Sequence, residues 1–334
     1  MIFVTGATGF LGAYITHYLV GSGARVRALK RSNSPLQLCQ TFVDKVEWVD
    51  ADINDTDALL DMLQGVNQIY HIAGLVSFDP QDRRSLYRIN HVGTQNIVNA
   101  AIKSGVKKIL YASSISAIGR SSKSDLVNEE TEWLAGSESN SAYGDSKRLG
   151  EMEVWRAMAE GMEGVVVNPS IILGSGYWKG SLGFTKTVDR GLKFYPAGKT
   201  GLVDVRDVAD ICIKLMNSDI SAEKFILSAQ DMYYKDFLQT LARHLGVTPP
   251  SRLAGPLATE LVWRMEWLRS KITARRPIIT KKTARFSQKV WTFSNEKICQ
   301  RLNYEFREIV ETIAEMCQDY LSSKDRGESY AFRP

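Results

Sequence analysis

Cysteine and histidine are scarce in this chain of 334 residues. The four cysteines (Cys39, Cys212, Cys299 and Cys317) are scattered, and no two of them form a Cys-x-x-Cys pair. This excludes a zinc knuckle and a disulfide framework, and it fits a reducing compartment. The four histidines show no metal-ligand spacing, so we expect no metal site.

Long apolar runs and a strong charge of one sign are also missing. No run reaches the ~18 residues of a membrane span, and no basic region followed by an apolar stretch opens the chain, so we expect no secretory signal and a cytoplasmic protein. Lysine and arginine number 42 against 37 acids, a net charge of +5. This small excess gives no reason to expect nucleic acid as a partner. With 44% apolar and 24% charged residues, the composition is typical of a globular protein.

Strand and helix signals alternate over the first half of the chain. Strands separated by helical segments need crossover connections, which put helices on both faces of a parallel sheet. The pattern therefore predicts an α/β fold with a doubly wound parallel sheet of the Rossmann type. Expected strands are 2–4, 25–29, 46–49, 68–73, 108–113 and 165–167, and expected helices are 11–20, 83–104 and 143–160.

Glycines at a spacing of three and three occupy the turn between the first strand and the first helix. The first glycine permits a tight turn, the second lets the backbone approach a pyrophosphate, and the third lets helix and strand pack closely. The helix N-terminus then offers N–H groups and the positive end of its dipole to the phosphates. A glycine-rich turn without a ligand is the alternative, but the strand–helix context favours dinucleotide binding. The predicted contacts are Gly6, Thr8, Gly9, Phe10, Leu11 and Gly12.

The end of the second strand indicates which dinucleotide is bound. An NAD site usually places a carboxylate there, about 20 residues past the glycines, whereas this strand ends in Lys30 and Arg31, with no acid until Asp44. Cations attract a 2′-phosphate, and arginine does so with a bidentate fork. Strand alternation points the two side chains to opposite faces, and we favour Arg31. The sequence thus predicts NADP (NADPH), with NAD as the alternative and two ordinary exposed cations as the non-functional explanation.

The sequence texture changes after Pro169. Residues 230–290 are helical in pattern but rich in Trp, Arg and Lys, whereas 203–216 and 225–228 look like a return to the sheet. We therefore predict a smaller substrate domain interleaved with the dinucleotide-binding domain. The dinucleotide-binding domain is predicted at 1–168 with returning segments at about 202–229 and 290–294, and the substrate-binding domain at 169–201 plus 230–325.

Eight short motifs, taken in order, resemble the extended short-chain dehydrogenase/reductase family. Within it the chain most resembles the dihydroflavonol-reductase-like and 3β-hydroxysteroid-dehydrogenase-like branch. The motifs are Thr5-Gly6-x-x-Gly9-x-x-Gly12, Asp52-Ile53, His71-Ile72-Ala73-Gly74, Asn90-x-x-Gly93-Thr94, Tyr111-Ala112-Ser113-Ser114, Tyr143-Gly144-Asp145-Ser146-Lys147, Asn168-Pro169-Ser170 and Val205-Arg206-Asp207-Val208-Ala209.

The resemblance also implies positions around the cofactor. It implies that Asp52 and Ile53 border the adenine and that Ala73 and Gly74 line the dinucleotide cleft. It places Pro169 and Ser170 near the nicotinamide. A homodimer through the helices 83–104 and 143–160 is expected on the same ground.

A tyrosine and a lysine four residues apart on one helix can perform carbonyl reduction. The alkoxide that hydride transfer creates needs an acid, and a nearby cation stabilises the phenolate of a tyrosine. Tyr-x-x-x-Lys occurs three times, at 143/147, 195/199 and 320/324. Pro196 and Gly198 break the helix that the second pair needs, and we expect Tyr320 in a frayed tail. Only Tyr143 and Lys147 have a suitable setting, and the resemblance implies that Lys147 also binds the nicotinamide ribose.

Ser114 ends the fifth strand, 29 residues before Tyr143. The resemblance implies that it hydrogen-bonds the substrate oxygen, whereas a polar group that caps a loop is the plain alternative. The neighbouring Ser113 is expected to point to the opposite face. Asn90 is predicted near the cofactor, where it either contacts it or holds a backbone geometry.

These observations predict an NADP-dependent oxidoreductase that reversibly reduces the carbonyl of a small apolar or aromatic substrate. A sugar-nucleotide 4-epimerase with tightly bound NAD and a non-catalytic NADP-binding regulator remain alternatives. The residues after Ser114 are Ile115-Ser116-Ala117, not the Asp-Glu pair of dehydratases. The expected pocket segments are 174–184, 191–201 and 257–268, with Arg190 or Arg206 as residues that could hold a phosphate. Their apolar members are Tyr177, Trp178, Leu182, Phe184, Phe194, Tyr195, Leu257, Leu261 and Trp263.

An apolar stripe at helical spacing crosses residues 257–272, and nine cations against one acid fill 264–289. We favour a lid or packing helix with a solvated basic face, because relatives of this branch have a similar apolar segment. An interfacial helix on anionic lipid is the second interpretation, and nucleic acid is a weaker third.

Overall fold

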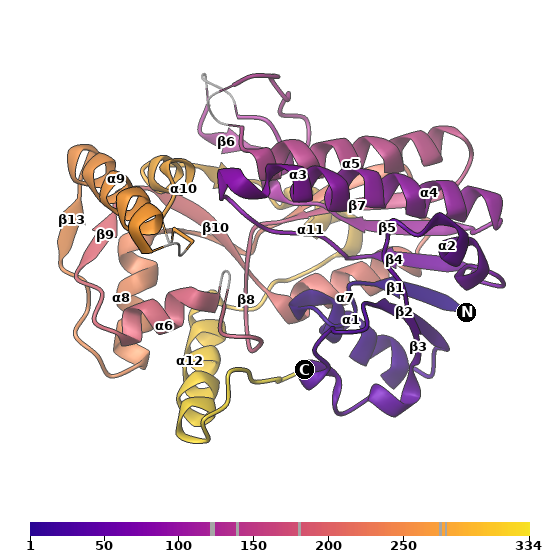
Figure 1. Cartoon of the computed structure of the whole chain (residues 1–334), viewed down its shortest axis with the longest axis horizontal. Helices are drawn as coiled ribbons and strands as arrows, with labels where there is room; N and C mark the ends of the chain where they lie inside the picture. The colour runs from indigo at the N-terminus through magenta and orange to yellow at the C-terminus, as the bar shows by residue number, and fades with distance from the viewer. Residues whose placement is uncertain (121–123, 138–139, 180–181, 274–275, 278) are drawn as a thin grey trace.

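The main sheet lies in the right half of the molecule as drawn in Figure 1. The computed structural model describes residues 1–120, 124–137, 140–179, 182–273, 276–277 and 279–334. In this described chain the seven parallel strands of the main sheet follow the order β11-β7-β5-β4-β1-β2-β3. The order steps outward from β1 in both directions, which confirms the predicted doubly wound fold. The strands are β1 (Ile2–Thr5), β2 (Val26–Lys30), β3 (Glu47–Asp50), β4 (Gln68–His71), β5 (Lys108–Ala112), β7 (Glu163–Pro169) and β11 (Glu223–Leu227).

Helices cover both faces of this sheet because its strands are apolar on both sides. In β1, Val4 packs into the core formed with α1 and α7, and Phe3 packs into the core formed with α2, α4 and α5. Both side chains are fully buried. The covering helices are α1 (Phe10–Gly21), α2 (Thr56–Met62), α4 (Gly93–Lys103), α5 (Ala142–Ala159), α7 (Val205–Met216) and α11 (Glu296–Leu302).

The predicted helix 83–104 consists of three consecutive segments. They are α3 (Arg83–Leu86), the π-helical η4 (Tyr87–Val92) and α4. A π-helical turn inside a helix often marks a functional position, and η4 carries Asn90 near the carboxyl ends of the strands. Short 3-10 turns connect other elements: η1 (Gln37–Cys39), η2 (Val43–Lys45), η3 (Pro80–Asp82) and η5 (Ile115–Ala117).

A smaller unit with its own core lies beside the main sheet, on the left of Figure 1. Its sheet has the order β12-β10-β8, and two further strand pairs are β13-β9 and β14-β6. The chain re-enters the main sheet after β10, since β11 pairs with β7. The remaining elements are β6 (Leu126–Val127), β8 (Ile171–Leu173), β9 (Phe194–Pro196), β10 (Lys199–Asp204), β12 (Gln230–Tyr233), β13 (Arg252–Ala254), β14 (Thr292–Phe293), α6 (Gly183–Asp189), α8 (Tyr234–His244), α9 (Pro256–Thr273), α10 (Lys281–Phe286) and α12 (Ile309–Asp325).

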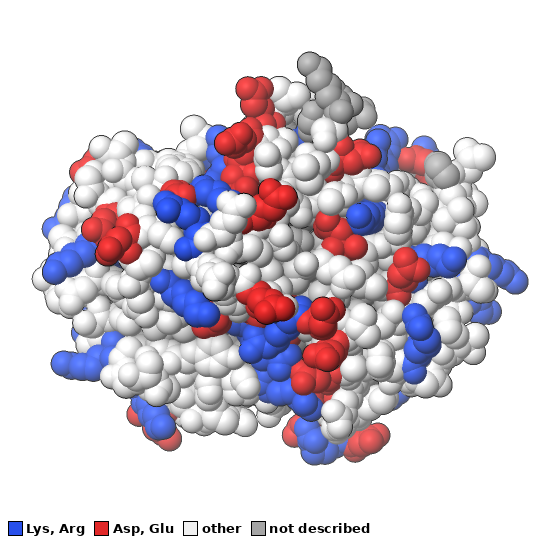
Figure 2. Space-filling model, turned by 180° about the vertical axis from the view of Figure 1, so that it is seen from behind, with Lys and Arg blue, Asp and Glu red and all other residues white. Residues whose placement is uncertain are grey.

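Charged side chains of both signs are interspersed on the face shown in Figure 2. Among the described residues, no helix combines the length and apolar composition needed to cross a bilayer.

Candidate active site

The predicted site residues gather at one edge of the main sheet. They follow the carboxyl ends of neighbouring parallel strands, the edge where ligands bind in such folds. Gly6 to Gly12 follow β1, Lys30 and Arg31 end β2, Asp52 and Ile53 follow β3, Ala73 and Gly74 follow β4, Ser114 follows β5, and Pro169 and Ser170 end β7. Tyr143 and Lys147 lie on α5, and Asn90 lies in η4.

The glycine turn has the geometry of a phosphate cradle. Gly6 has a φ of +74°, and a Cβ on it would lie 2.7 Å from the backbone nitrogen of Ala73. A Cβ on Gly12 would lie 2.1 Å from the carbonyl oxygen of Gly6. Among the described residues no side chain caps the N-terminus of α1, and its first turn holds no acid. Its N–H groups and dipole therefore suit a pyrophosphate, and the residues present fit a dinucleotide.

A directional chain of hydrogen bonds joins this turn to η4. The Ala73 N–H donates to Thr5 Oγ1 (3.1 Å), and Thr5 Oγ1 lies 2.6 Å from His71 Nδ1. His71 Nε2 lies 2.9 Å from Thr94 Oγ1, which donates to the Asn90 carbonyl (2.7 Å). Because Thr94 donates onward, it accepts from Nε2–H, and Nδ1 accepts from Thr5. Burial lowers the pKa of His71 to about 3, so its neutral ring is structural.

Asn90 holds the backbone that follows β4. Its Oδ1 accepts from the Leu75 N–H (2.7 Å), and its Nδ2 donates to the Leu75 carbonyl and to Ser146 Oγ (both 2.9 Å). A Cβ on Gly74 would lie 3.3 Å from both Asn90 Oδ1 and Lys147 Nζ. Asn90 thereby fixes Gly74 beside Lys147. This corresponds to the second role considered for Asn90 from the sequence, in which it holds a backbone geometry.

The side chains of Ser114 and Tyr143 lie close to each other at this edge, near enough for the Ser114 hydroxyl to act on the pKa of Tyr143. Burial raises the pKa of Tyr143, and the Ser114 hydroxyl opposes that rise. The Tyr143 hydroxyl is therefore protonated at neutral pH and available as a proton donor. The ring of Phe78 meets the ring of Tyr143 edge-on, with their centroids 5.6 Å apart.

Lys147 lies one helical turn after Tyr143 and is buried. Its Nζ is 4.3 Å from the centroid of the Tyr111 ring. Burial lowers the pKa of Lys147 to about 7, and the charge of Glu151 opposes part of this lowering. The amine thus changes its charge close to neutral pH, which is unusual for a lysine.

Glu151 is a member of the site that sequence reasoning missed. It is fully buried and follows Lys147 by four residues on α5. Its Oε2 accepts from Ser113 Oγ (2.9 Å) and from Asn168 Nδ2 (3.2 Å), and Asn168 also donates to the Ser114 carbonyl (2.9 Å). The spacing of four residues could have indicated Glu151 from the sequence, because positions 143, 147 and 151 share one helix face.

Two buried polar atoms near the end of β7 lack a partner among the described residues. They are Asn168 Oδ1 and Ser170 Oγ. Buried polar atoms are nearly always hydrogen-bonded in folded proteins, so these atoms fit a group that docks against this strand end.

Comparison with known proteins agrees with this geometry. The profile of the NAD dependent epimerase/dehydratase family matches residues 2–226. The chain belongs to this family. It is an extended short-chain dehydrogenase/reductase, and the match confirms the resemblance drawn from the motifs.

The enzyme's relatives include reductases. A Synechocystis sp. protein provisionally named dihydroflavonol 4-reductase is 30% identical over 328 residues, which cover 94% of this chain and 92% of that protein. Sterol demethylase protein B of Methylococcus capsulatus is 29% identical over 256 residues, or 76% of each chain. The crystal structure of gox2253 matches with a TM-score of 0.82 and 26% identity over 98% of each chain. The family and these relatives mark the chain as an enzyme of the oxidoreductase or epimerase type.

The two cations at the end of β2 differ in their surroundings. Lys30 Nζ forms a 2.5 Å ion pair with Asp50 on the neighbouring strand β3. Arg31 is exposed at the carboxyl edge. Hydrogen bonds from Asn54 lower the pKa of Asp52, and the charges of Arg88 and Arg31 add to this lowering. Lys30 is thus engaged within the protein, whereas Arg31 is exposed.

The two other Tyr-x-x-x-Lys pairs of the enzyme are structural. Tyr195 lies in β9 and Lys199 in β10, as the helix breakers predicted. The prediction of a frayed tail around Tyr320 is wrong, because Tyr320 is buried within α12. Its hydroxyl donates to Asp189 (3.0 Å), and Lys324 forms a 2.8 Å ion pair with the same carboxylate.

Part of the predicted substrate pocket is wrong as well. Trp178 and Leu182 are buried in the core of the smaller unit, and Phe184 packs against it. The Trp178 indole donates to Ser323 Oγ (2.7 Å) and its ring meets Tyr320 edge-on. An aromatic cluster in the sequence does not tell core residues from pocket residues, since only tertiary packing decides which ones are covered.

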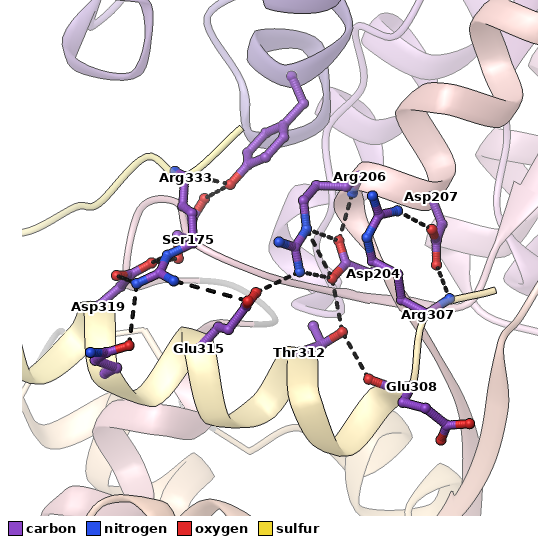
Figure 3. Close-up of polar contacts among 12 residues, drawn as sticks. Ser175, Asp204, Arg206, Asp207, Arg307, Glu308, Thr312, Glu315, Asp319 and Arg333 are labelled. Atoms are coloured by element: carbon purple, nitrogen blue, oxygen red, sulfur yellow. Dashed lines mark hydrogen bonds and ion pairs between the residues drawn. The ribbon is translucent and has the colours of Figure 1, made fainter.

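Arg206 does not hold a phosphate in the enzyme. It forms ion pairs with Asp204 (2.6 Å) and Glu315 (2.7 Å), so its guanidinium joins α7 to α12 (Figure 3). Thr312 donates to the same buried Asp204 (2.8 Å). This network engages the Arg206 guanidinium within the protein.

Among the described residues, no group of three or more His, Cys, Asp or Glu side chains could hold a metal ion.

Proposed function

We propose that the protein is an NADP-dependent oxidoreductase that reversibly reduces the carbonyl of a small apolar or aromatic substrate. The observation that carries the proposal is the placement of Ser114 beside Tyr143, with Lys147 one turn further along α5. The hydroxyls lie at the strand edge where the glycine turn fits a dinucleotide.

Each side chain has a separate role in this proposal. Ser114 Oγ donates a hydrogen bond to the carbonyl oxygen, and Tyr143 donates its hydroxyl proton to the same oxygen as negative charge develops. Lys147 stabilises the resulting phenolate and hydrogen-bonds the nicotinamide ribose. When bound, the nicotinamide supplies the hydride in reduction and accepts it in oxidation.

The remaining residues would position the cofactor. Gly6, Thr8, Gly9, Phe10, Leu11 and Gly12 would hold the pyrophosphate, and Asp52 and Ile53 would border the adenine. Ala73, Gly74 and Asn90 would shape the cleft, and Pro169 and Ser170 would meet the nicotinamide. Arg31 would bind the 2′-phosphate, because Lys30 is paired with Asp50.

The surroundings of Tyr143 support an apolar substrate over a sugar nucleotide. Phe78 packs on Tyr143, and Val76 of the same loop is two-thirds exposed (66%). Arg206 is engaged by two carboxylates. A diphosphate in this site would not find the Arg206 guanidinium free to pair with its charge.

We also propose the interleaved division of the chain and a homodimer. The dinucleotide-binding domain would comprise 1–168 with 202–229 and 290–294, and the substrate-binding domain 169–201 plus 230–325. The dimer would form through the outer faces of the helices in 83–104 and 143–160, where Tyr87 and Met152 are exposed. Light scattering on the purified protein tests it, with a dimeric mass expected.

A substrate screen that follows NADPH absorbance tests the proposed function. We expect turnover of aromatic or alicyclic ketones or aldehydes, cofactor that exchanges between turnovers, and no epimerisation of UDP-hexoses. Stoichiometric, non-exchanging NAD in the purified protein, together with conversion of a UDP-sugar to its 4-epimer, would establish the epimerase instead.

A further inference from the structure

The helix α9 packs on the protein through its polar face. Thr259 Oγ1 accepts a hydrogen bond from Gln288 Nε2 (2.7 Å), and Glu260 forms a 2.9 Å ion pair with Arg285 of α10. Glu266 forms a 2.5 Å ion pair with Arg269 on the same helix. An amphipathic helix of a globular protein normally does the opposite and turns its apolar face inward.

The apolar face of α9 points away from the protein. Five side chains at helical spacing form a stripe, here called the outer stripe, in which the exposed fraction ranges from 53% at Leu268 to 88% at Leu257. Trp267 beside the stripe is also more than half exposed. Contiguous exposed apolar surface of this kind marks an interaction site. The stripe consists of Leu257, Leu261, Met265, Leu268 and Ile272.

The segment that carries the stripe is strongly basic. Residues 256–289 hold nine lysines and arginines against two glutamates, a formal charge of +7, whereas the whole chain has +5. On a helical projection Arg264 and Lys271 lie directly beside the outer stripe, and both are exposed. Long basic side chains in this position can keep their stems on apolar surface while their charges reach anionic groups.

We infer that the outer stripe of α9 docks on the surface of an anionic phospholipid bilayer, with the helix lying in the plane of the interface. An in-plane amphipathic helix has apolar and tryptophan side chains on one face and lysines and arginines at its border. A second copy of this chain fits the surface poorly, because a symmetric contact would bring two segments of charge +7 together.

The chain that follows α9 adjoins the proposed active site. Arg276, which follows α9, forms a 2.7 Å ion pair with Asp82 beside α3. Burial raises the pKa of Asp145, which lies two residues after Tyr143, and the charges of Arg83 and of Lys282 in α10 oppose that rise. Membrane docking does not depend on which reaction the site performs.

Flotation with lipid vesicles tests the inference. Wild-type protein is mixed with phosphatidylcholine vesicles containing phosphatidylglycerol, and with pure phosphatidylcholine vesicles. We expect binding to the anionic vesicles that weakens with salt, and much weaker binding to the neutral ones. No flotation with anionic vesicles at low salt would overturn the inference, whatever the substrate screen finds.

Two pairs of matched variants locate the surface. Leu261→Gln with Met265→Gln should weaken vesicle binding by more than tenfold, whereas the equally apolar and exposed control, Leu134→Gln with Val310→Gln, should not. Arg264→Gln with Lys271→Gln should weaken it by roughly fivefold per cation, whereas Lys214→Gln with Arg326→Gln removes the same charge elsewhere and should have little effect.

Circular dichroism verifies that each variant is folded. Equal binding by the stripe variant and the wild type would refute the assignment to α9. A change in oligomeric mass on mutating the stripe, without any vesicle binding, would refute the lipid in favour of a second copy.

Discussion

Lys147 changes its charge close to neutral pH because burial lowers its pKa to about 7, against the opposing effect of the negative charge of Glu151. If turnover requires the protonated amine, activity falls as the pH rises through this pKa. The carboxylate four residues further along α5 therefore sets how far into the basic range the enzyme works.

We predict that Glu151→Gln moves the basic limb of the kcat/KM profile to lower pH, because it removes the charge that raises the pKa of Lys147. The measurement is kcat/KM against pH. Glu153→Gln is the matched control, since Glu153 lies on the same helix but pairs with Arg156 (3.0 Å). An unchanged profile in Glu151→Gln would show that the carboxylate does not act through Lys147.

Arg31 should decide the choice between the two cofactors. A charge-assisted contact to phosphate contributes roughly 1.5–3 kcal/mol, which is on the order of tenfold or more in affinity. Arg31→Ala should therefore weaken NADPH binding by that factor and leave NADH binding unchanged, as measured by fluorescence titration. Equal affinities of the wild type for NADPH and NADH would contradict the assignment.

At the scale of elements, α5 approaches its neighbours through glycines. A Cβ on Gly150 would lie 2.3 Å from the Asn90 carbonyl oxygen and 2.5 Å from the Tyr111 hydroxyl. A Cβ on Gly144 would lie 2.3 Å from the carbonyl oxygen of Ser116. These close approaches bring the helix of Tyr143 against the strand end of Ser114.

Gly150→Ala should lower the free energy of unfolding by about 1–3 kcal/mol, because the added methyl overpacks this contact. Gly21→Ala is the matched control at a helix position with no heavy atom within 4 Å of the added Cβ. Alanine should be neutral there, or stabilise by up to about 1 kcal/mol through helix propensity. Denaturant unfolding measures both, and similar changes in the two variants would mean that the close packing is unimportant.

Sequence periodicity predicted the elements of the main sheet well, because both-sided burial leaves a continuous apolar run in each strand. The sequence also predicted the site residues that depend on local geometry. These are Tyr143 and Lys147, one helical turn apart, and Ser114 at a strand end. The π-helical form of η4 carries no comparable signal, and Tyr320 was misplaced because its burial comes from a distant partner, Asp189. The stripe of α9 was visible in the sequence, but its outward orientation depends on which face α10 contacts.

At the scale of the whole molecule, buried charges connect the smaller unit to the main sheet. Asp204 is fully buried between β10 and α7, and it accepts hydrogen bonds from Arg206 and from Thr312 of α12 (Figure 3). Asp207 binds Arg307 in the same way just before α12. The residues around Arg206 therefore stabilise the contact between α7 and α12 in this enzyme.

Asp204→Asn should lower the free energy of unfolding by about 3 kcal/mol, because breaking a buried ion pair leaves its partner poorly compensated. Asp210→Asn removes an exposed partner of Lys214 on the same helix and should cost less than about 1 kcal/mol. Thermal and denaturant unfolding compare the two variants. Equal losses would show that the network does not hold the molecule together.

The central claim is that Tyr143 donates the proton in an NADPH-dependent carbonyl reduction. Its most direct test is the turnover of Tyr143→Phe beside that of Tyr320→Phe, with NADPH and a carbonyl substrate of the wild type, together with NADPH affinity. We predict that Tyr143→Phe loses at least about 100-fold in kcat while NADPH still binds. Tyr320→Phe should keep substantial activity, because the Tyr320 hydroxyl donates its hydrogen bond to Asp189. A Tyr143→Phe variant that turns over near the wild-type rate would contradict the account.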